Sequence, residues 1–175
     1  AERDGQSEDV CTYVKADLGM MMGGEIGPTG DPLPRPDILR LSYTGCNPRG
    51  MFLARDKALS KKLLQYHRIA VPEFAMVARG RKARLPKGLT FPVIVKSLTQ
   101  EASIGISQAS VVDDEVKLRE RVQFIHESIQ TDAIVEQYVE GRELYCAIAG
   151  NQRLQVFPVW EMLFSKMPED QHRIA

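Results

Sequence analysis

A lysine at the end of an apolar segment is followed by a loop of small residues. Lys96 ends residues 91–96 (FPVIVK), and residues 99–105 include Ser103 and Gly105. An ammonium group can neutralise phosphate oxygens, while a hydroxyl and backbone N–H groups cradle them. The spacing is not that of a P-loop, because Gly-x-x-x-x-Gly-Lys-Ser/Thr is absent. Taken alone, the motif is better explained by a strand-ending lysine and an ordinary hairpin loop.

Two carboxylates flank a tight turn further along the chain. Glu136 precedes the turn at residues 140–142 (EGR), and Glu143 follows it. Backbone donors and acceptors beside Tyr138 and Val139 can read the edge of a flat heterocycle, and a carboxylate past the turn can bind two vicinal hydroxyls. Taken alone, this segment is again better explained by a polar hairpin.

A third candidate, Lys57, lies near the start of an expected helix, where a solvated lysine is ordinary. The order of the motifs is more informative than any one of them. They run in the order 43–45 (YTG), 55–57 (RDK), 91–96 (FPVIVK), 103–106 (SIGI) and 136–143 (EQYVEGRE). This order and spacing resembles the ATP-grasp enzymes, most closely the D-alanine–D-alanine ligases, over roughly residues 41–164.

The resemblance implies an ATP site between two α+β subdomains. Lys57 and Lys96 match the phosphate-contacting lysines of the family, and Ser103 and Gly105 match its flexible loop over the phosphates. The residues that match the adenine-reading hinge and the ribose-binding carboxylate are Glu136, Gln137, Tyr138, Val139 and Glu143, the last being the ribose ligand.

The family uses ATP and magnesium to activate a carboxylate as an acyl phosphate, and an amine then displaces the phosphate. The implied partners are therefore a nucleotide and small carboxylate and amine substrates. Three positions depart from the family pattern: Ala102 stands where Ser is common, Ser97 where Pro is common, and Gln137 where Lys is common.

The family's magnesium-binding carboxylates, its Asn ligand and its catalytic arginine lie beyond the position of Ala175. Magnesium is thus expected for the family without ligands in this chain, and no catalytic residue is assigned. We expect the chain alone not to form a peptide bond at a rate typical of its family. The first residue is Ala1 rather than Met, which leaves open a piece of a longer ligase. The alternative is a non-catalytic nucleotide-binding or partner-docking fragment.

Charge suggests a rival function. Residues 54–87 hold ten Lys or Arg and two Asp or Glu. Such a basic stretch with neighbouring aromatic residues can bind nucleic acid. No recognition-helix or RNA-binding motif accompanies it, so the ATP site is the preferred interpretation.

The elements that position these motifs follow from periodicity and breakers. Asn47-Pro48 is a good helix start, and a helical period runs to about Tyr66. Strands are expected at 73–78, 91–96 and 106–111. Acidic residues at 113–115 open a second helix with one apolar stripe, which consists of Leu118, Val122, Ile125 and Ile129.

Three further strands, at 133–139, 144–149 and 154–159, are expected as an antiparallel meander with a Gly150-Asn151 turn. The order of elements predicts an α+β, ATP-grasp-like fold with antiparallel strands and flanking helices. We expect an irregular Gly/Pro-rich leader or remnant at 1–40, the first (lid) subdomain with its entry helix at 41–139, and the beginning of the second subdomain at 140–175.

Composition sets the outer bounds. The 175 residues carry 23 Lys+Arg, 23 Asp+Glu and 43% hydrophobic residues, which suits one domain or two small ones and gives no global pull toward nucleic acid or membrane. Scattered cysteines (Cys11, Cys46 and Cys146) and histidines argue against a metal cluster and for reduced thiols in a cytoplasmic protein. Substrate identity and oligomeric state, including a homo-oligomer, stay open.

Overall fold

The computed structural model describes residues 48–100, 103–150, 152–168 and 170–174. The expected leader at 1–40 and the expected N-cap Asn47 lie outside the described residues. The helical elements are α2 (Pro48–Arg55), α3 (Lys57–Tyr66), η1 (Gln108–Ser110), α4 (Glu115–Phe124) and η2 (Ile125–Ile129). The strands are β1 (Phe74–Val77), β2 (Val93–Ser97), β3 (Val111–Val112), β4 (Ala133–Gln137), β5 (Glu143–Tyr145), β6 (Ile148–Ala149), β7 (Gln155–Val156) and β8 (Trp160–Met162).

The first helical segment is interrupted once. Asp56 adopts an extended backbone between α2 and α3, and its carboxylate accepts a hydrogen bond of 2.9 Å from the Leu59 N–H. Asp is a favoured N-cap because its side chain satisfies a backbone donor that the first helical turn leaves open. The expected single helix to Tyr66 is therefore two helices, and Lys57 is the first residue of α3 rather than part of a continuous helix.

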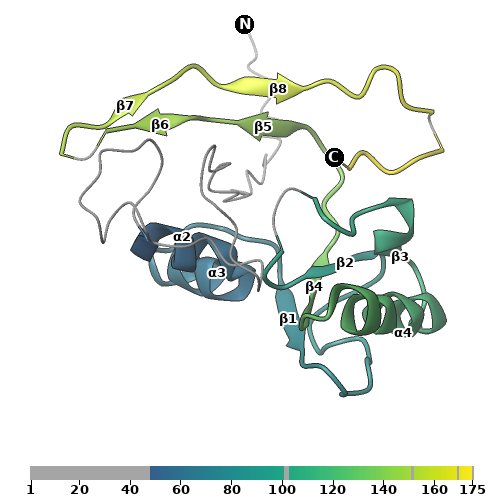
Figure 1. The fold of residues 1–175 in the computed structure, drawn as a ribbon. Coiled ribbons are helices and arrows are strands. Elements are labelled where there is room, and N and C mark those ends of the chain that lie inside the picture. The colour runs from purple at the N-terminus through teal and green to yellow at the C-terminus, as the bar shows by residue number, and fades with distance from the viewer. Residues whose placement is uncertain (1–47, 101–102, 151, 169, 175) are drawn as a thin grey trace, which may run out of the picture.

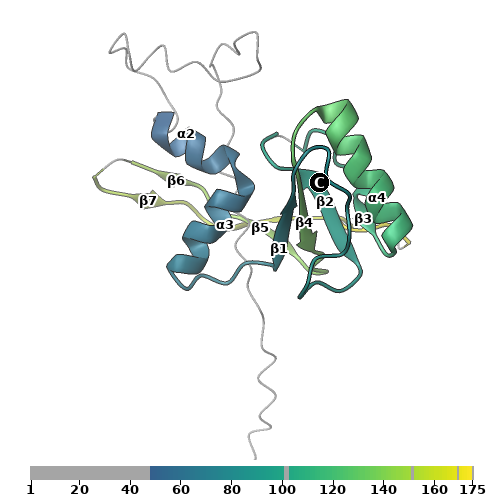
Figure 2. The ribbon, with the colours of Figure 1, turned by 90° about the horizontal axis from the view of Figure 1, so that it is seen from below.

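A four-stranded antiparallel sheet in the order β1-β4-β2-β3 forms the centre of the described part of the chain. Helix α3 lies on one side of this sheet and α4 on the other (Figure 2). Side chains alternate between the two faces of a strand. Val93 and Val95 of β2 and Val135 of β4 thus point to the α4 face, where they pack in one core cluster.

The two faces of the sheet differ in chemistry. On the α4 face, Leu118, Val122 and Ile125 are almost completely buried, as their spacing predicted, and Ile129 is partly buried against the same cluster. The α3 face has a small cluster of Ala58, Leu98 and Ile134 with Phe74 packed against it. The alternate positions of β2 and β4 on this face include Lys96 and Glu136.

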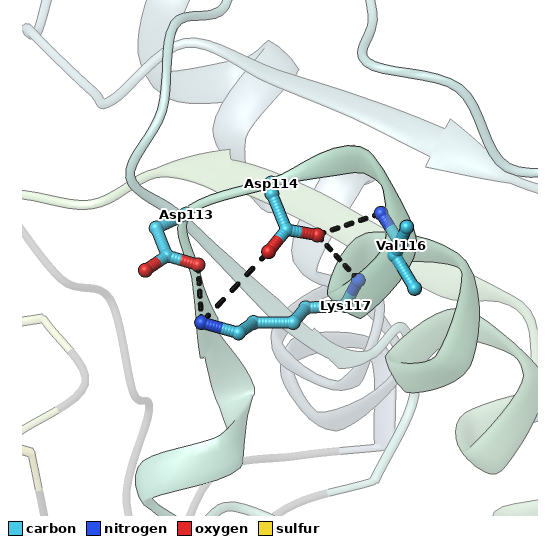
Figure 3. A network of polar contacts seen from close by, with 4 residues as sticks. All are labelled: Asp113, Asp114, Val116 and Lys117. Carbon is cyan, nitrogen blue, oxygen red and sulfur yellow. Dashed lines mark hydrogen bonds and ion pairs between the residues drawn. The ribbon is translucent and has the colours of Figure 1, made fainter.

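The N-terminus of α4 is capped as the acidic residues predicted. The Asp114 carboxylate accepts hydrogen bonds from the backbone N–H groups of Val116, at 2.7 Å, and Lys117, at 2.8 Å (Figure 3). The Lys117 ammonium in turn pairs with Asp113 at 2.6 Å. These contacts fix where α4 begins, immediately after β3.

The strand expected at 106–111 is wrong for most of its length. The chain forms a turn and the short 3₁₀ helix η1 before the two-residue strand β3. The cause is local: the Ser107 N–H donates to the Ser110 hydroxyl at 3.0 Å, and the Ser110 N–H donates to the Ser107 carbonyl at 2.8 Å. Serines that bond to nearby backbone offer the chain an alternative to a sheet ladder.

The expected three-stranded meander is also corrected. β4 pairs with β1 and β2, whereas β5 pairs with β8 and β6 with β7. Figure 1 shows these last four strands as a long two-stranded ribbon beyond the helices and the main sheet. Its apolar side chains are largely exposed, among them Trp160 at 72% and Leu163 at 75%. Within the described ranges, no helix combines the length and apolar character that a bilayer crossing requires.

Candidate functional site

Two of the predicted site residues meet on the α3 face of the sheet. The Lys96 ammonium donates a hydrogen bond of 3.0 Å to Oε2 of Glu136, although the two residues are 40 positions apart in the chain. The antiparallel register places Ile94 opposite Glu136 and Lys96 opposite Ile134, so both charged side chains leave neighbouring strands on the same face. Sheet geometry alone therefore brings this lysine and this carboxylate together.

Glu136 is a buried anion. Only 4% of its surface is exposed, and Lys61 adds a second ion pair to the same oxygen at 3.5 Å. Burial by itself would raise the pKa of Glu136, but the charges and hydrogen bonds of Lys96 and Lys61 outweigh it and hold the pKa below its ordinary value. The carboxylate is therefore ionised near neutral pH and holds two ammonium groups in place.

Lys61 is a site residue that the sequence reasoning missed. It lies one helical turn after Lys57, and positions i and i+4 of a helix lie on the same side. This spacing was a usable signal, because it places both lysines on one side of α3. The side chain of Lys61 also lies over the Phe74 ring, 5.6 Å from its centroid, on the same face of the sheet as Glu136.

The chain that follows β2 is fastened to the α2–α3 junction through three consecutive carbonyl groups. The Lys57 N–H donates to the Leu98 carbonyl at 3.2 Å, the Arg55 Nε donates to the Thr99 carbonyl at 3.1 Å, and the Lys57 ammonium donates to the Gln100 carbonyl. Lys57 and Lys96 therefore both approach the start of the loop that contains Ser103 and Gly105.

Ser103 and Gly105 form a sharp turn. Both residues have positive φ angles, of 56° and 75°, and the Ile106 N–H donates back to the Ser103 carbonyl at 2.9 Å. A Cβ atom added to Gly105 would lie 3.1 Å from Cδ1 of Ile129, so glycine is required by both angle and space. Ser103 is exposed at the surface of the turn.

The predicted hinge lies at the end of β4. The Gln137 N–H donates to the Glu73 carbonyl at 2.8 Å, and the Tyr138 N–H donates to the Pro92 carbonyl at 3.3 Å. Among the described residues, no hydrogen bond outside helices and strands involves the main chain of Val139. The hinge therefore keeps only one of its three predicted residues open at the main chain, and Gln137 uses its side chain to bond Pro92 and Thr90.

Tyr138 contacts the C-terminal segment. Its ring meets His172 edge-on at 5.1 Å, and burial and the nearby Glu140 carboxylate raise the pKa of Tyr138 above its ordinary value. His172 is joined to Gln108 by two hydrogen bonds, from the Gln108 amide to the His172 carbonyl at 3.0 Å and from the His172 N–H to Gln108 at 2.9 Å. The hinge and the end of the loop segment thus share one neighbour.

Glu143 lies in a different sheet from the other charged site residues. It begins β5, opposite Met162 of β8, and its carboxylate accepts a hydrogen bond from the Tyr145 hydroxyl. In the described part of the chain, no three His, Cys, Asp or Glu side chains gather in a group that could hold a metal ion. Cys146 is a free and exposed thiol.

The comparison with protein families identifies this arrangement. The family described as D-ala D-ala ligase C-terminus matches residues 63–170, well over half of the chain. The chain therefore belongs to this ATP-grasp, D-alanine–D-alanine ligase-like family, and its fold class is α+β as predicted. The matched residues include every predicted site residue except Lys57, which precedes the start of the match.

Two relatives agree with this assignment. The chain is 35% identical over 125 residues to the uncharacterized protein y4sG of Sinorhizobium fredii, covering 71% of this chain and 36% of that protein. It is 33% identical over 140 residues to the D-alanine--D-alanine ligase of Syntrophotalea carbinolica, covering 78% and 43% respectively. The chain thus spans less than half the length of these relatives.

A structural neighbour shows the same fold. The D-alanine--D-alanine ligase from Bacillus anthracis, solved in complex with ATP, superposes with a TM-score of 0.62 at 21% identity, over 76% of this chain and 43% of that one. A short match to an unrelated protein also exists: 70% identity over 46 residues to a benzoyl-CoA reductase of Thauera aromatica. It covers 26% of this chain but only 11% of that reductase chain, too little to transfer its activity.

Proposed function

We propose that this chain is the ATP-binding part of an ATP-dependent carboxylate–amine ligase. The observation that carries the proposal is the Lys96–Glu136 pair at 3.0 Å, because two residues matched independently to the nucleotide site prove to be neighbours on one sheet face. In the proposed site, Lys57 and Lys96 contact the phosphates, and the turn at Ser103 and Gly105 covers them. The B. anthracis ligase that shares the fold was solved with ATP, which supports this choice of nucleotide.

The base and the sugar occupy the other end of the proposed site. The Val139 main chain is the open part of the hinge, and it reads the adenine edge by backbone hydrogen bonds. The N–H groups of Gln137 and Tyr138 are committed to Glu73 and Pro92, so these two residues shape the hinge rather than donate to the base. Glu143, one strand further on, accepts the ribose hydroxyls.

The proposed reaction consists of two group transfers. A substrate carboxylate oxygen attacks the γ-phosphorus of ATP, the bond to the bridging oxygen breaks, and ADP leaves. The nitrogen of a neutral amine then attacks the acyl carbon of the acyl phosphate, inorganic phosphate leaves with the bonding electron pair, and the amine loses a proton to give the amide. Lysine ammonium groups beside the phosphates favour the first transfer, because they stabilise charge on the transferring group.

Magnesium has no role that the described residues can define. The family uses it to bridge phosphates, but the described residues contain no cluster of acidic side chains suited to hold it. No step of the proposed reaction is therefore assigned to the metal. The residues of this chain are assigned to binding the nucleotide and to orienting its phosphates.

Calorimetry with ADP tests the site. Lys96→Met removes the ammonium but keeps most of the side-chain stem, and loss of a charge-assisted hydrogen bond is expected to cost about 1.5–3 kcal/mol of binding free energy. Lys117→Met is the matched control, because Lys117 is an exposed lysine on α4, on the opposite side of the sheet. Equal ADP affinity in the Lys96 variant and the wild type would overturn the site assignment.

A second assay separates ligation from simple nucleotide binding. If the chain contributes to a ligase, ADP release from ATP rises when a carboxylate substrate is added together with the remaining parts of such an enzyme. The alternative, a non-catalytic nucleotide-binding fragment, predicts ADP binding without any carboxylate-dependent release. Thermal unfolding of each variant shows whether a lost affinity reflects a lost fold.

A further inference from the structure

One charged residue of α4 is buried on the core side of the helix. Arg121 is only 8% exposed, and it lies three residues after Leu118 and four before Ile125, within the stripe that faces the sheet. A buried charge is costly unless hydrogen bonds or an opposite charge compensate it. An apolar residue would satisfy the helix pattern at this position, so the guanidinium calls for an explanation.

The contacts of Arg121 lead to the loop and not to an acid. Its Nη2 donates to the Gly105 carbonyl and, at 2.7 Å, to the Ser110 hydroxyl. The guanidinium lies over the Phe124 ring, 4.5 Å from its centroid. No carboxylate within the described ranges pairs with it, and its Nε is buried without a hydrogen-bond partner. Burial lowers the pKa of Arg121 below its ordinary value, although an arginine stays charged.

The bond to Gly105 acts on the peptide group that closes the turn. A trans peptide is planar, with its C=O and N–H pointing in opposite directions. The carbonyl of Gly105 faces Arg121, and the N–H of the same peptide, on Ile106, donates to the Ser103 carbonyl at 2.9 Å. The guanidinium therefore fixes the orientation of the peptide that holds Ser103 in the turn.

The bond to Ser110 fixes the other end of the segment. Ser110 is fully buried, and its hydroxyl also accepts the Ser107 N–H at 3.0 Å. One guanidinium nitrogen thus joins the peptide at Gly105 to the residue that immediately precedes β3. Removal of the guanidinium would release both anchors at once.

We propose that Arg121 is a positioning residue for the loop at 103–110, which it holds in the conformation that faces the phosphates of the nucleotide. This inference rests on the proposed function, because that function makes the loop a phosphate-covering element. Arg121 itself does not touch the nucleotide. It acts through the Gly105 peptide and the Ser110 hydroxyl.

Binding of two ligands by the 175-residue chain tests the proposal. Arg121→Met keeps the bulk of the side chain and removes both hydrogen bonds, and Arg119→Met, an exposed residue on the same helix, is the control. By calorimetry, ADP affinity is expected to fall about tenfold in Arg121→Met, with adenosine affinity within about twofold of wild type. Arg121→Lys, which retains a cationic donor, should recover part of the ADP affinity. An equal loss for ADP and adenosine, or no loss, would overturn the proposal.

Hydrogen exchange makes the test independent of nucleotide binding. The Ile106 and Ser107 amides are hydrogen-bonded within the loop, so they should exchange about tenfold faster in Arg121→Met than in Arg119→Met. Unchanged exchange would refute the positioning role even if the wild type bound no nucleotide, a result that would reject the proposed function separately. If Arg121→Met does not fold, Ser110→Ala removes one anchor, and the same two amides report the outcome.

Discussion

Lys96 and Glu136 project from adjacent antiparallel strands onto the same sheet face, and their charged atoms lie 3.0 Å apart. The carboxylate is more deeply buried than the ammonium, with 5% of its side chain exposed against 13% for Lys96. A buried charge that loses its partner is costly. The pair therefore contributes to stability as well as to the proposed nucleotide site, and the two contributions can be separated by titration.

The acid stability of the protein should depend on Glu136. Its folded-state pKa lies below the ordinary 4.5, so the unfolded chain binds this proton more readily. The stabilising contribution is present above about that value and is lost as the pH falls through the lower folded-state pKa. In Glu136→Gln, we expect a loss of about 3 kcal/mol in unfolding free energy at pH 7 and a shallower fall below pH 5.

Urea titrations between pH 3 and pH 7 measure this effect. Glu120→Gln is the control, because Glu120 is an exposed residue of α4 on the opposite side of the sheet. An acid limb that is as steep in the Glu136 variant as in the control would contradict the assignment of the titration to Glu136.

Two glycines allow backbone strain to be separated from crowding. Gly105 and Gly88 have similar positive φ angles, of 75° and 88°, but only an added Cβ at Gly105 would meet a neighbour, the Ile129 side chain at 3.1 Å. Alanine at either position should cost about 1–2 kcal/mol from the left-handed conformation. We expect Gly105→Ala to cost more than Gly88→Ala in urea unfolding and to weaken ADP binding, which Gly88→Ala should leave unchanged. Equal effects would show that crowding against Ile129 is unimportant.

The cap of α4 provides a simple test of local structure. Asp114 satisfies two backbone donors in the first turn, whereas Asp113 mainly pairs with the exposed Lys117 ammonium (Figure 3). Asp114→Ala should lower the unfolding free energy by about 1 kcal/mol. Asp113→Ala should have a smaller effect, because exposed ion pairs are screened by solvent. The reverse order in chemical denaturation would argue against the capping role.

The sequence predicted best where one physical cause acts along a short segment. The stripe of Leu118, Val122 and Ile125 required only helical periodicity, and the acidic start of the helix required only the preference for a capping carboxylate. The resemblance supplied the family and the candidate nucleotide site. It did so from the order of several motifs, none of which was specific alone.

The remainder depended on contacts between distant segments. Periodicity cannot show that Arg121 in the buried stripe is held by the Gly105 carbonyl, since the bond needs the loop to fold back onto α4. Hydrogen bonding between Ser107 and Ser110 replaced a strand that the apolar pattern favoured. The ribbon strands were expected in sequence order, but pairing of β5 with β8 is a long-range choice that no local pattern encodes.

The rival function makes a prediction about the connection between β1 and β2. Its basic residues are exposed: Arg79, Arg81, Lys82, Arg84 and Lys87. By contrast, Arg55, Lys57 and Lys61, earlier in the basic stretch, bond to the loop after β2 or to Glu136. The stretch is therefore divided between internal contacts and an exposed surface loop, and it is not one continuous patch.

Binding of nucleic acid should accordingly be weak and purely electrostatic. Release of counterions from phosphates makes such binding fall steeply with salt, and non-specific complexes have dissociation constants of about 10⁻⁴–10⁻⁶ M at physiological salt. We expect single-stranded and duplex oligonucleotides to fall in this range by fluorescence anisotropy. The triple change Arg81→Gln, Lys82→Gln and Arg84→Gln should abolish the binding without altering ADP affinity. Sub-micromolar binding at physiological salt, lost in this triple variant while ADP binding is retained, would favour a nucleic-acid function for the loop.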